Sequence, residues 1–291
     1  MELISDYMRN EANRHMLNAL TQKTFGIDFE NWVTKGYFEG DYIPYSYIED
    51  GKMISNVSAN RMHFMQNGVE RNYIQIGTVM TDSDYRKQGL AGKLLQHVIK
   101  AYEQECDGIY LFGDLSAVGF YQKMGFEILN QYRYHVKEAY CNSTSKGEAF
   151  VPIKSLGEDM PRKYMDAVRT SSLHSAFEQL NKFGLQMFYT ADFENVYYAK
   201  DIDCFIVIEQ EDCTVLQSVL CNEKVSLEDV LSRMEIVNNR CVLGFVPLVE
   251  EQYICDCEIY DGEEDYRLFY RGSKLASVEH DKLYFPDLSH A

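Results

Sequence analysis

The sequence of 291 residues lacks a surplus of positive charge. It contains 28 lysine and arginine residues against 45 aspartate and glutamate residues, which gives a formal net charge of −17. This balance argues against a protein that mainly binds nucleic acid or an anionic membrane, because phosphate binding needs a basic face. Two uses of the acidity stay open: solubility, and attraction of a cationic substrate or partner.

The sequence also lacks long hydrophobic runs and a leader segment. No stretch approaches the roughly 18 apolar residues needed to cross a bilayer, and residues 1–6 carry neither a basic segment nor an apolar one. The eight cysteines do not form a disulfide scaffold in a chain of this length. Cys255 and Cys257, a close pair, have neither the spacing nor the second pair that a zinc site needs. We therefore expect a cytoplasmic protein with reduced cysteines and no bound metal.

The acidic residues are concentrated in the second half of the chain. Residues 1–140 hold 14 basic and 18 acidic side chains, whereas residues 141–291 hold 14 and 27. The change falls in residues 141–147, a small and polar stretch typical of a linker. The sequence therefore predicts two domains, over residues 1–140 and 150–291.

Hydrophobic periodicity places helices and strands in both halves. In residues 89–104, for example, Leu90, Leu94 and Val98 recur on one helical face. The order of strands, helix and strand in the second half resembles that of the first, so a degenerate repeat is an open interpretation. The expected helices cover 10–23, 29–35, 89–104, 116–123, 161–181 and 226–234. The expected strands cover 45–48, 53–65, 73–80, 109–112 and 126–136, two or three segments within 196–220, and then 241–247 and 267–271.

The segment 75–93 is the most informative for chemistry. It reads as a strand, a short loop and a helix that begins with small residues, and a helix N-terminus offers unpaired N–H groups to a phosphate. Gly89, Ala91 and Gly92 would let the backbone approach a pyrophosphate closely, and the segment carries local positive charge at Arg86 and Lys87. An ordinary strand-to-helix turn is the alternative. Neither a P-loop nor a dinucleotide fingerprint is present, because their required residues are missing.

Two motifs then carry a resemblance to a known family. The residues Arg-Lys-Gln-Gly-Leu-Ala at 86–91 resemble the acetyl-CoA-binding motif of the GNAT superfamily of acetyltransferases. The segment 117–126, with Phe120-Tyr121 and Gly125-Phe126, resembles the second signature of that family. The resemblance covers residues 1–137. It implies an α/β protein with a GNAT-type acyl-CoA N-acyltransferase fold, a mixed central sheet flanked by helices. Beyond it we expect a C-terminal α+β domain that does not bind CoA, as in two-domain bacterial members.

The resemblance also implies roles for individual residues. The cosubstrate would be acetyl-CoA, and Tyr121 would be the general acid that protonates the leaving thiolate. The residues implied in CoA binding are Val79 and Met80 along the pantetheine, then Arg86, Lys87, Gln88, Gly89, Leu90, Ala91 and Gly92 around the pyrophosphate.

The sequence departs from the family pattern at two positions. Many members have an asparagine where this chain has Gly113-Asp114, and a glutamate that activates the amine is replaced by Gln75. A neutral amide cannot accept a proton, although it can hold a water that does. The base would then be Glu70, Asp114, an ordered water or the carboxyl end of the segment 286–291.

The first two helices and their loop recognise the acceptor in this family. Here they contribute Phe29, Glu30 and Trp32, and aromatic rings beside carboxylates suit an amine. A buried aromatic cluster beside solvated acids is the alternative. We expect transfer of an acetyl group to a primary amine of a cationic small molecule or peptide, by direct attack in a ternary complex. A non-catalytic acyl-CoA sensor or partner-recruiting module is the competing hypothesis, and a homodimer stays open.

Overall fold

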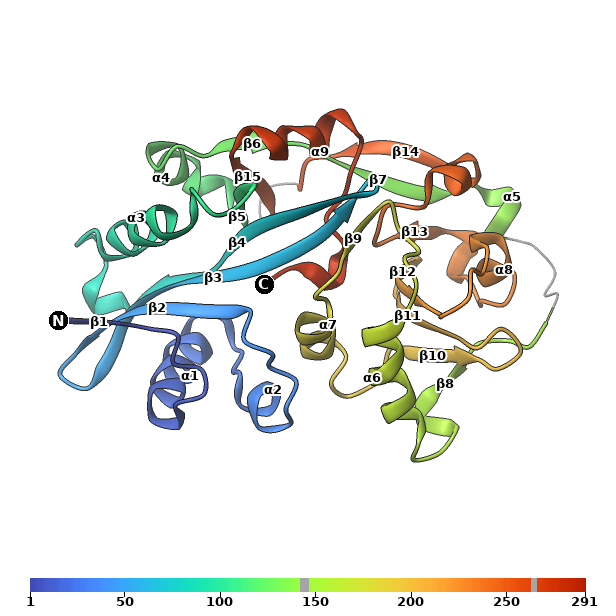
Figure 1. Ribbon diagram of the computed structural model, residues 1–291, viewed down its shortest axis with the longest axis horizontal. Helices are drawn as coiled ribbons and strands as arrows, with labels where there is room; N and C mark the ends of the chain where they lie inside the picture. The colour runs from blue at the N-terminus through green and yellow to red at the C-terminus, as the bar shows by residue number, and fades with distance from the viewer. Residues whose placement is uncertain (142–146, 263–265) are drawn as a thin grey trace.

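The computed structural model describes residues 1–141, 147–262 and 266–291, and it contains two β-sheets that lie side by side (Figure 1). The first sheet has the strand order β1-β2-β3-β4-β5-β15-β6, with β9 attached to β3, and the second has the order β14-β7-β13-β12-β11-β10-β8. Neighbouring strands are antiparallel except for β4 with β5 and β12 with β13. The mixed sheets and flanking helices confirm the expected α/β class.

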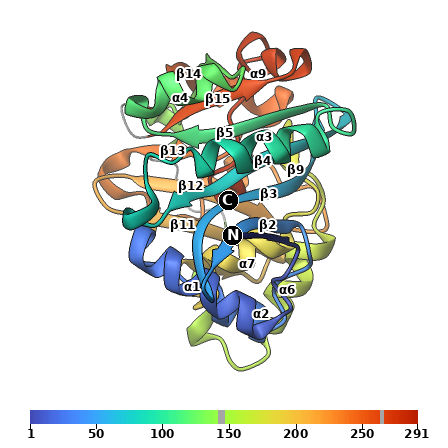
Figure 2. The same ribbon diagram turned by 90° about the vertical axis from the view of Figure 1, so that its left-hand side faces the viewer.

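The first sheet is covered by helices on both faces (Figure 2). Helices α1 (Glu11–Phe25) and α2 (Glu30–Thr34) pack on one face, and α3 (Leu90–Tyr102) and α4 (Val118–Lys123) pack on the other. The strands are β1 (Glu2–Ser5), β2 (Tyr42–Glu49), β3 (Lys52–Gln66), β4 (Val69–Thr81), β5 (Gly108–Gly113), β6 (Glu127–Leu129), β9 (Phe177–Gln179) and β15 (Arg267–Arg271).

The second sheet has the same layered construction. Helices α6 (Met160–Thr170) and α7 (Phe183–Tyr189) pack on one face of its central strands, and α8 (Leu227–Leu231) packs on the other. Two short helices, α5 (Glu138–Cys141) and α9 (Ser277–His280), flank the strands. The strands are β7 (Gln131–Val136), β8 (Val151–Pro152), β10 (Val196–Ala199), β11 (Cys204–Gln210), β12 (Thr214–Leu220), β13 (Cys241–Leu243) and β14 (Cys255–Tyr260).

Local signals in the first half produce the expected elements. Asn10 caps α1 by accepting a hydrogen bond from the Asn13 N–H at 3.0 Å, and Gly26 ends the helix with a φ of 73°. Asp50 and Gly51 both have positive φ in the turn between β2 and β3, as a two-residue hairpin requires. The expected strands and helices as far as α4 are therefore confirmed, with shifted ends.

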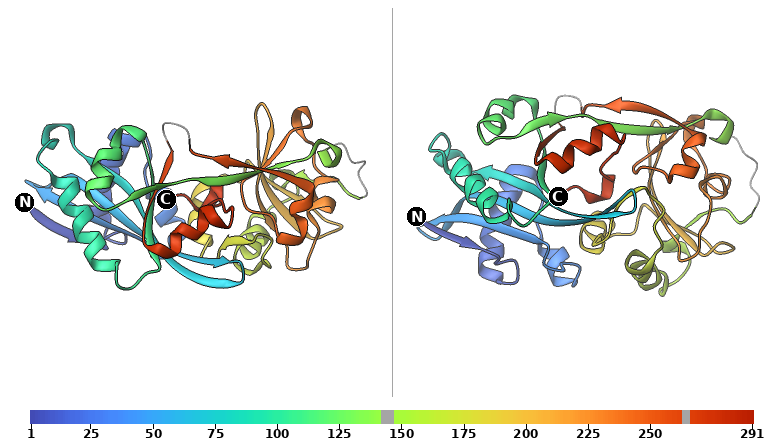
Figure 3. Two further views of the ribbon diagram at one scale, coloured as in Figure 1. Left: turned by 90° about the horizontal axis from the view of Figure 1, so that it is seen from above. Right: turned by 45° about the horizontal axis from the view of Figure 1, so that its top comes forward.

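Two expected elements are wrong, and in each case long-range pairing decides. The single strand expected over 126–136 is divided at Asn130, because β6 pairs with β15 whereas β7 pairs with β13 and β14. The green segment accordingly runs from one half of the molecule to the other (Figure 3). The helix expected over 161–181 ends at Thr170, and β9 pairs with β3 instead. The ring of Phe177 stacks on that of Phe64 with their centroids 4.5 Å apart.

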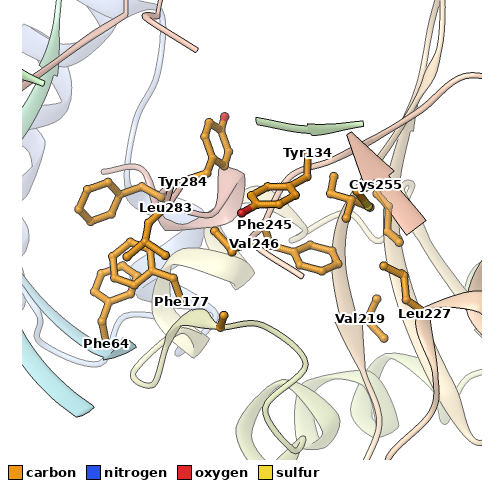
Figure 4. Close-up of a cluster of buried hydrophobic side chains, with 14 of the residues drawn as sticks. Phe64, Tyr134, Phe177, Val219, Leu227, Phe245, Val246, Cys255, Leu283 and Tyr284 are labelled. Carbon is orange, nitrogen blue, oxygen red and sulfur yellow. The ribbon is translucent and has the colours of Figure 1, made fainter. Parts of the chain in front are cut away.

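Each sheet contains strands from both sides of residue 140. Strand β7 precedes that position and belongs to the second sheet, whereas β9 and β15 follow it and belong to the first. One buried apolar cluster extends from Phe64 and Phe177 to Val219 and Leu227 (Figure 4). The division into domains 1–140 and 150–291 stays a prediction, and the two sheets share one core.

Candidate active site

The strands β4 and β5 are paired over only three positions. The parallel register joins Tyr73 with Gly108, Ile74 with Ile109 and Gln75 with Tyr110, and no further pair joins them in the part of the chain that the structure describes. Beyond this point β4 continues its pairing with β3, while β5 continues with β15 as far as Gly113. The two strands therefore part, and the backbone of β4 from Ile76 onward is left without a strand on that side.

A β-bulge deforms β4 just beyond the parting. The register between β3 and β4 shifts between Asn56 and Ser58, and Thr78 has a φ of 41°. The Thr78 hydroxyl holds this conformation through contacts with the Tyr42 hydroxyl (2.7 Å), the Ser58 hydroxyl (2.7 Å) and Asn56 Nδ2 (3.0 Å). Bulges re-aim the residues that follow them, here Val79 and Met80, the residues expected along the pantetheine.

Helix α3 begins close to this strand, and the N–H groups before Lys93 have no partner within the helix. Gly89 precedes it with a φ of 75°, and a Cβ added there would meet no heavy atom within 4 Å, so the glycine is required by its backbone conformation. Gly92 differs, because a Cβ there would lie 3.2 Å from Cε of Met124, the residue that follows α4. Its small size serves packing against the end of α4, and its approach to a phosphate stays a prediction. No acidic side chain occupies the first turn of α3.

Asp82 fixes the loop between β4 and α3. Its carboxylate accepts hydrogen bonds from Lys52 at 2.9 Å, from Lys23 at 3.2 Å and from the Asp84 N–H at 3.1 Å. The Lys52 ammonium is the main cause that lowers the pKa of Asp82 to about 2. The loop is thus held by a permanently ionised group, while Lys87 and Gln88 stay exposed.

Tyr121 lies against β5 at the end of the opened gap. A Cβ added to Gly113 would stand 3.1 Å from Tyr121 Cε2, so the glycine makes room for the ring. The ring also packs on Phe269 of β15, with centroids 4.9 Å apart. Burial raises the pKa of the phenol to about 12, so the hydroxyl is protonated at neutral pH.

The other two expected catalytic residues have different surroundings. Gln75 is buried at the last paired position, and its Oε1 accepts a long hydrogen bond from the Tyr110 hydroxyl at 3.4 Å. Asp114 is exposed and caps the following turn by accepting from the Ser116 N–H at 2.5 Å. Its hydrogen bonds with Ser116 lower the pKa of Asp114, which makes the carboxylate a weaker base.

The segment 286–291 runs between the two sheets and reaches β4. A Cβ built on Gly77 would lie 2.7 Å from the carbonyl oxygen of Ala291. His290 is buried, its ring lies 4.1 Å from that of Phe112, and its Nδ1 and Nε2 contact the Tyr266 hydroxyl (3.1 Å) and the Phe285 carbonyl (3.3 Å). Burial lowers the pKa of His290 to about 4, so the ring is neutral at pH 7.

Of the three expected acceptor-binding residues, Phe29 and Trp32 share one apolar cluster and Glu30 forms an ion pair. Phe29 is buried in an apolar cluster with Tyr42. Glu30 accepts two hydrogen bonds from Arg14, at 2.8 and 2.9 Å, which are the first cause that lowers its pKa. Trp32 belongs to the same cluster, but it also lines a cavity of about 20 Å³ between β3 and α7. We call this the β3–α7 cavity. Its other lining residues are Glu39, Asp41, Tyr42, Asn60, Arg61, Met62, Gln179, Asn181, Gly184 and Leu185.

Sequence reasoning missed the buried polar face of β3. Asn56, Ser58 and Asn60 alternate along the strand and are at most 2% exposed. A polar repeat with a period of two inside an otherwise apolar strand is the signal that could have found them. Gln179 carries no comparable signal, because it reaches the site only through the pairing of β9 with β3.

The described residues fit a CoA ester and offer no metal centre. The first-turn amides of α3 suit a pyrophosphate, and the free backbone of β4 beside the bulge suits a pantetheine amide chain. Among residues 1–141, 147–262 and 266–291, no group of three or more histidine, cysteine or carboxylate side chains is placed to hold a metal ion. In the same ranges no helix combines the length and apolar character required to span a bilayer.

Two parallel strands that part beside a helix N-terminus thus form the candidate site. Residues 5–126 match the model of the acetyltransferase (GNAT) family. A similar curated protein is N-alpha-acetyltransferase 50 of Danio rerio. It is 29% identical over 150 residues, which cover 50% of this chain and 83% of the relative.

Solved structures of acyltransferases share the fold across both sheets. A probable N-acyltransferase from Enterococcus faecalis V583 aligns with a TM-score of 0.56 at 11% identity, over 94% of this chain and 72% of its own. A GCN5-related N-acetyltransferase from Kribbella flavida aligns with a TM-score of 0.54 at 13% identity, over 95% and 72%. The expected GNAT-type fold is therefore confirmed, and the likeness extends beyond residue 137.

Proposed function

We propose that this protein transfers an acetyl group from acetyl-CoA to a primary amine by direct attack within a ternary complex. The observation that carries the proposal is the parting of β4 and β5 at Gln75 and Tyr110, with Tyr121 on one side of the gap. The first-turn amides of α3 would hold the pyrophosphate, flanked by Arg86 and Lys87. The backbone of Val79 and Met80 would hold the pantetheine.

The reaction needs one bond formed, one bond broken and two proton movements. The neutral amine nitrogen attacks the thioester carbon and forms the C–N bond, and the C–S bond then breaks. The sulfur takes a proton from Tyr121, and the nitrogen loses one to a base. Tyr121 regains its proton from solvent. The protein supplies positioning and proton transfer, so it forms no covalent intermediate.

The base that accepts the amine proton is proposed to lie where the strands part. Glu70 stands at the other end of β4, opposite Met65, and Asp114 is engaged as a cap with a lowered pKa. Gln75 and the segment 286–291 both reach the parting. We therefore favour a water held by the Gln75 amide, or a group of that segment, over the two carboxylates.

Two measurements test the proposal. Titration with acetyl-CoA should show binding at micromolar concentration or tighter, and incubation with an amine panel should release free CoA thiol in amounts equal to the acetylated product. Absence of acetyl-CoA binding contradicts the whole assignment. Binding without thiol release from any amine favours the non-catalytic sensor, for which the neutral Gln75 is the specific argument.

The wider setting belongs to the same proposal. We propose a cytoplasmic bacterial enzyme with domains over residues 1–140 and 150–291, in which a small-molecule or peptide amine is the acceptor. A homodimer is compatible with the chain and follows from none of its described contacts.

A further inference from the structure

The β3–α7 cavity is enclosed by both halves of the chain. Asn60 and Asp41 come from β3 and from the loop before β2, whereas Gln179 ends β9 and Asn181 lies in the turn between β9 and α7. Its volume of about 20 Å³ is enough for a water-sized group such as an ammonium head.

Two residues that line the cavity each have a buried side-chain oxygen without a described hydrogen-bond partner, and one of them, Gln179, also lines a neighbouring pocket. Asn60 Oδ1 and Gln179 Oε1 are unpaired among the described residues, although the two side chains are only 2% and 3% exposed. Their amide nitrogens are engaged: Asn60 Nδ2 donates to the Gln75 carbonyl at 3.1 Å, and Gln179 Nε2 donates to Asn181 Oδ1 at 3.2 Å. Both unpaired atoms are acceptors, so the missing partner is a hydrogen-bond donor.

A carboxylate among the lining residues indicates that this donor carries a positive charge. Asp41 lines the cavity, accepts a hydrogen bond from Asn181 Nδ2 at 2.9 Å, and makes no ion pair among the described residues. Burial raises the pKa of Asp41, and the nearby charges of Arg61 and His63 offset only part of this cost, which a bound cation would reduce further. The cavity also holds Glu39, which is already paired with Arg169, and Arg61, whose side chain is exposed at the rim.

The cavity adjoins the β4 strand of the candidate active site. Asn60 is the register partner of Gln75, and its Nδ2 lies 3.1 Å from the position of a Cβ on Gly77. Ala291 occupies the same place at Gly77. A group bound at Asn60 is therefore next to the strand along which the pantetheine is proposed to lie.

We infer that the β3–α7 cavity binds the acceptor in its ammonium form, with Asn60 Oδ1, Gln179 Oε1 and the Asp41 carboxylate as its acceptors, before a proton is lost to solvent and the neutral amine attacks. An ammonium has three N–H donors, which matches these three acceptors in number. The inference rests on the proposed function and adds that the second half of the chain, through Gln179, selects the acceptor. A peptide α-amine and a small aliphatic amine share this chemistry.

The test separates binding from turnover. Calorimetry with the full chain saturated with CoA would use two probes: cadaverine, and a tetrapeptide amide with a free amino end beside its N-acetylated form. Thiol release from acetyl-CoA would be measured with the same amines. The variants are Asp41→Asn, which keeps the shape and the bond from Asn181, and Gln179→Leu, which removes the unpaired oxygen. Asp212→Asn makes the same charge change on an exposed loop and serves as the control.

At least one probe should bind, and Asp41→Asn and Gln179→Leu should each weaken it about tenfold or more, with acetyl-CoA affinity and melting temperature close to those of Asp212→Asn. Tighter binding of cadaverine or of the free peptide identifies the source of the amine, and the N-acetylated peptide should not bind. Failure of both probes to bind overturns the inference, as does equal binding in all three variants. Binding that depends on Asp41 without thiol release would overturn the proposed function and leave the ammonium site standing.

Discussion

Replacement of Tyr121 by phenylalanine is the most direct test of the chemistry. The ring is 7% exposed and packs on Phe269, and no hydrogen bond of its hydroxyl is found among the described residues. Tyr121→Phe therefore keeps the packing and breaks no hydrogen bond. Removal of a buried, unpaired hydroxyl should leave the free energy of unfolding unchanged or raise it by up to about 1 kcal/mol.

The size of the effect on kcat follows from the pKa of the phenol. General acids contribute about 10²- to 10⁴-fold, most when their pKa is matched to the task. A thiol has a pKa near 8.5, whereas burial raises that of Tyr121 to about 12. Proton transfer to a free thiolate is then uphill, so the proton must move as the C–S bond breaks. We expect kcat to fall about 100-fold, the lower end of the range, with an unchanged KM for acetyl-CoA.

The assay is thiol release under saturating acetyl-CoA, measured from pH 6 to pH 10. The phenol stays protonated throughout this range. Any loss of kcat at alkaline pH should therefore be the same in the wild-type protein and in Tyr121→Phe. Tyr102→Phe is the control, since that buried hydroxyl bonds to Tyr45 at 2.9 Å in the same core. It should cost about 1 kcal/mol of stability and leave kcat unchanged. A fall of less than threefold in Tyr121→Phe would remove this residue from the acid role.

Three further predictions follow from the loop and strand around the site. Gly89→Ala should cost about 1–2 kcal/mol of stability, because an L-residue is strained at a φ of 75°, and it should raise the KM for acetyl-CoA several-fold; an unchanged KM would argue against a phosphate site at α3. Asp82→Asn should lower the free energy of unfolding by about 1–2 kcal/mol at pH 7, a moderate value because its partner Lys52 is half exposed. Since the pKa of Asp82 is depressed to about 2, this contribution is complete above about pH 4 and disappears as the pH falls through 2, so denaturant titrations of the two proteins should converge there and differ at pH 7. Gly77→Ala would place a Cβ 2.7 Å from the Ala291 backbone oxygen, so it should displace the segment 286–291. We expect a lower kcat in the thiol-release assay and an unchanged melting temperature by calorimetry. Full activity would mean that this segment takes no part in catalysis.

The sequence predicted the elements that are specified locally. Asn10, Gly26 and the Asp50-Gly51 turn act within a few residues, and the structure has the corresponding helix and hairpin. It could not predict which strands meet. The break at Asn130 and the pairing of β9 with β3 depend on partners more than 100 residues away in the chain, and no local pattern records them.

The same distinction between local signals and long-range contacts applies to the candidate site. The motif residues 86–92 lie in the loop before α3 and in its first turn, and Tyr121 lies beside the parted strands. Phe29 packs in an apolar cluster and Glu30 pairs with Arg14. The roles of all these residues stay predictions. Residues that reach the cavity from the second half, Gln179 above all, had no signal because their position comes from tertiary structure alone.

The place of β15 has a consequence for biosynthesis. This strand lies between β5 and β6, with five residues paired to one neighbour and three to the other. During translation, β5 cannot pair with β15 until residue 271 has left the ribosome. The first half should therefore emerge as an incomplete sheet with an open edge, a state prone to aggregation. Expression of residues 1–140 alone should give insoluble or chaperone-bound material, and co-expression with 150–291 should rescue it.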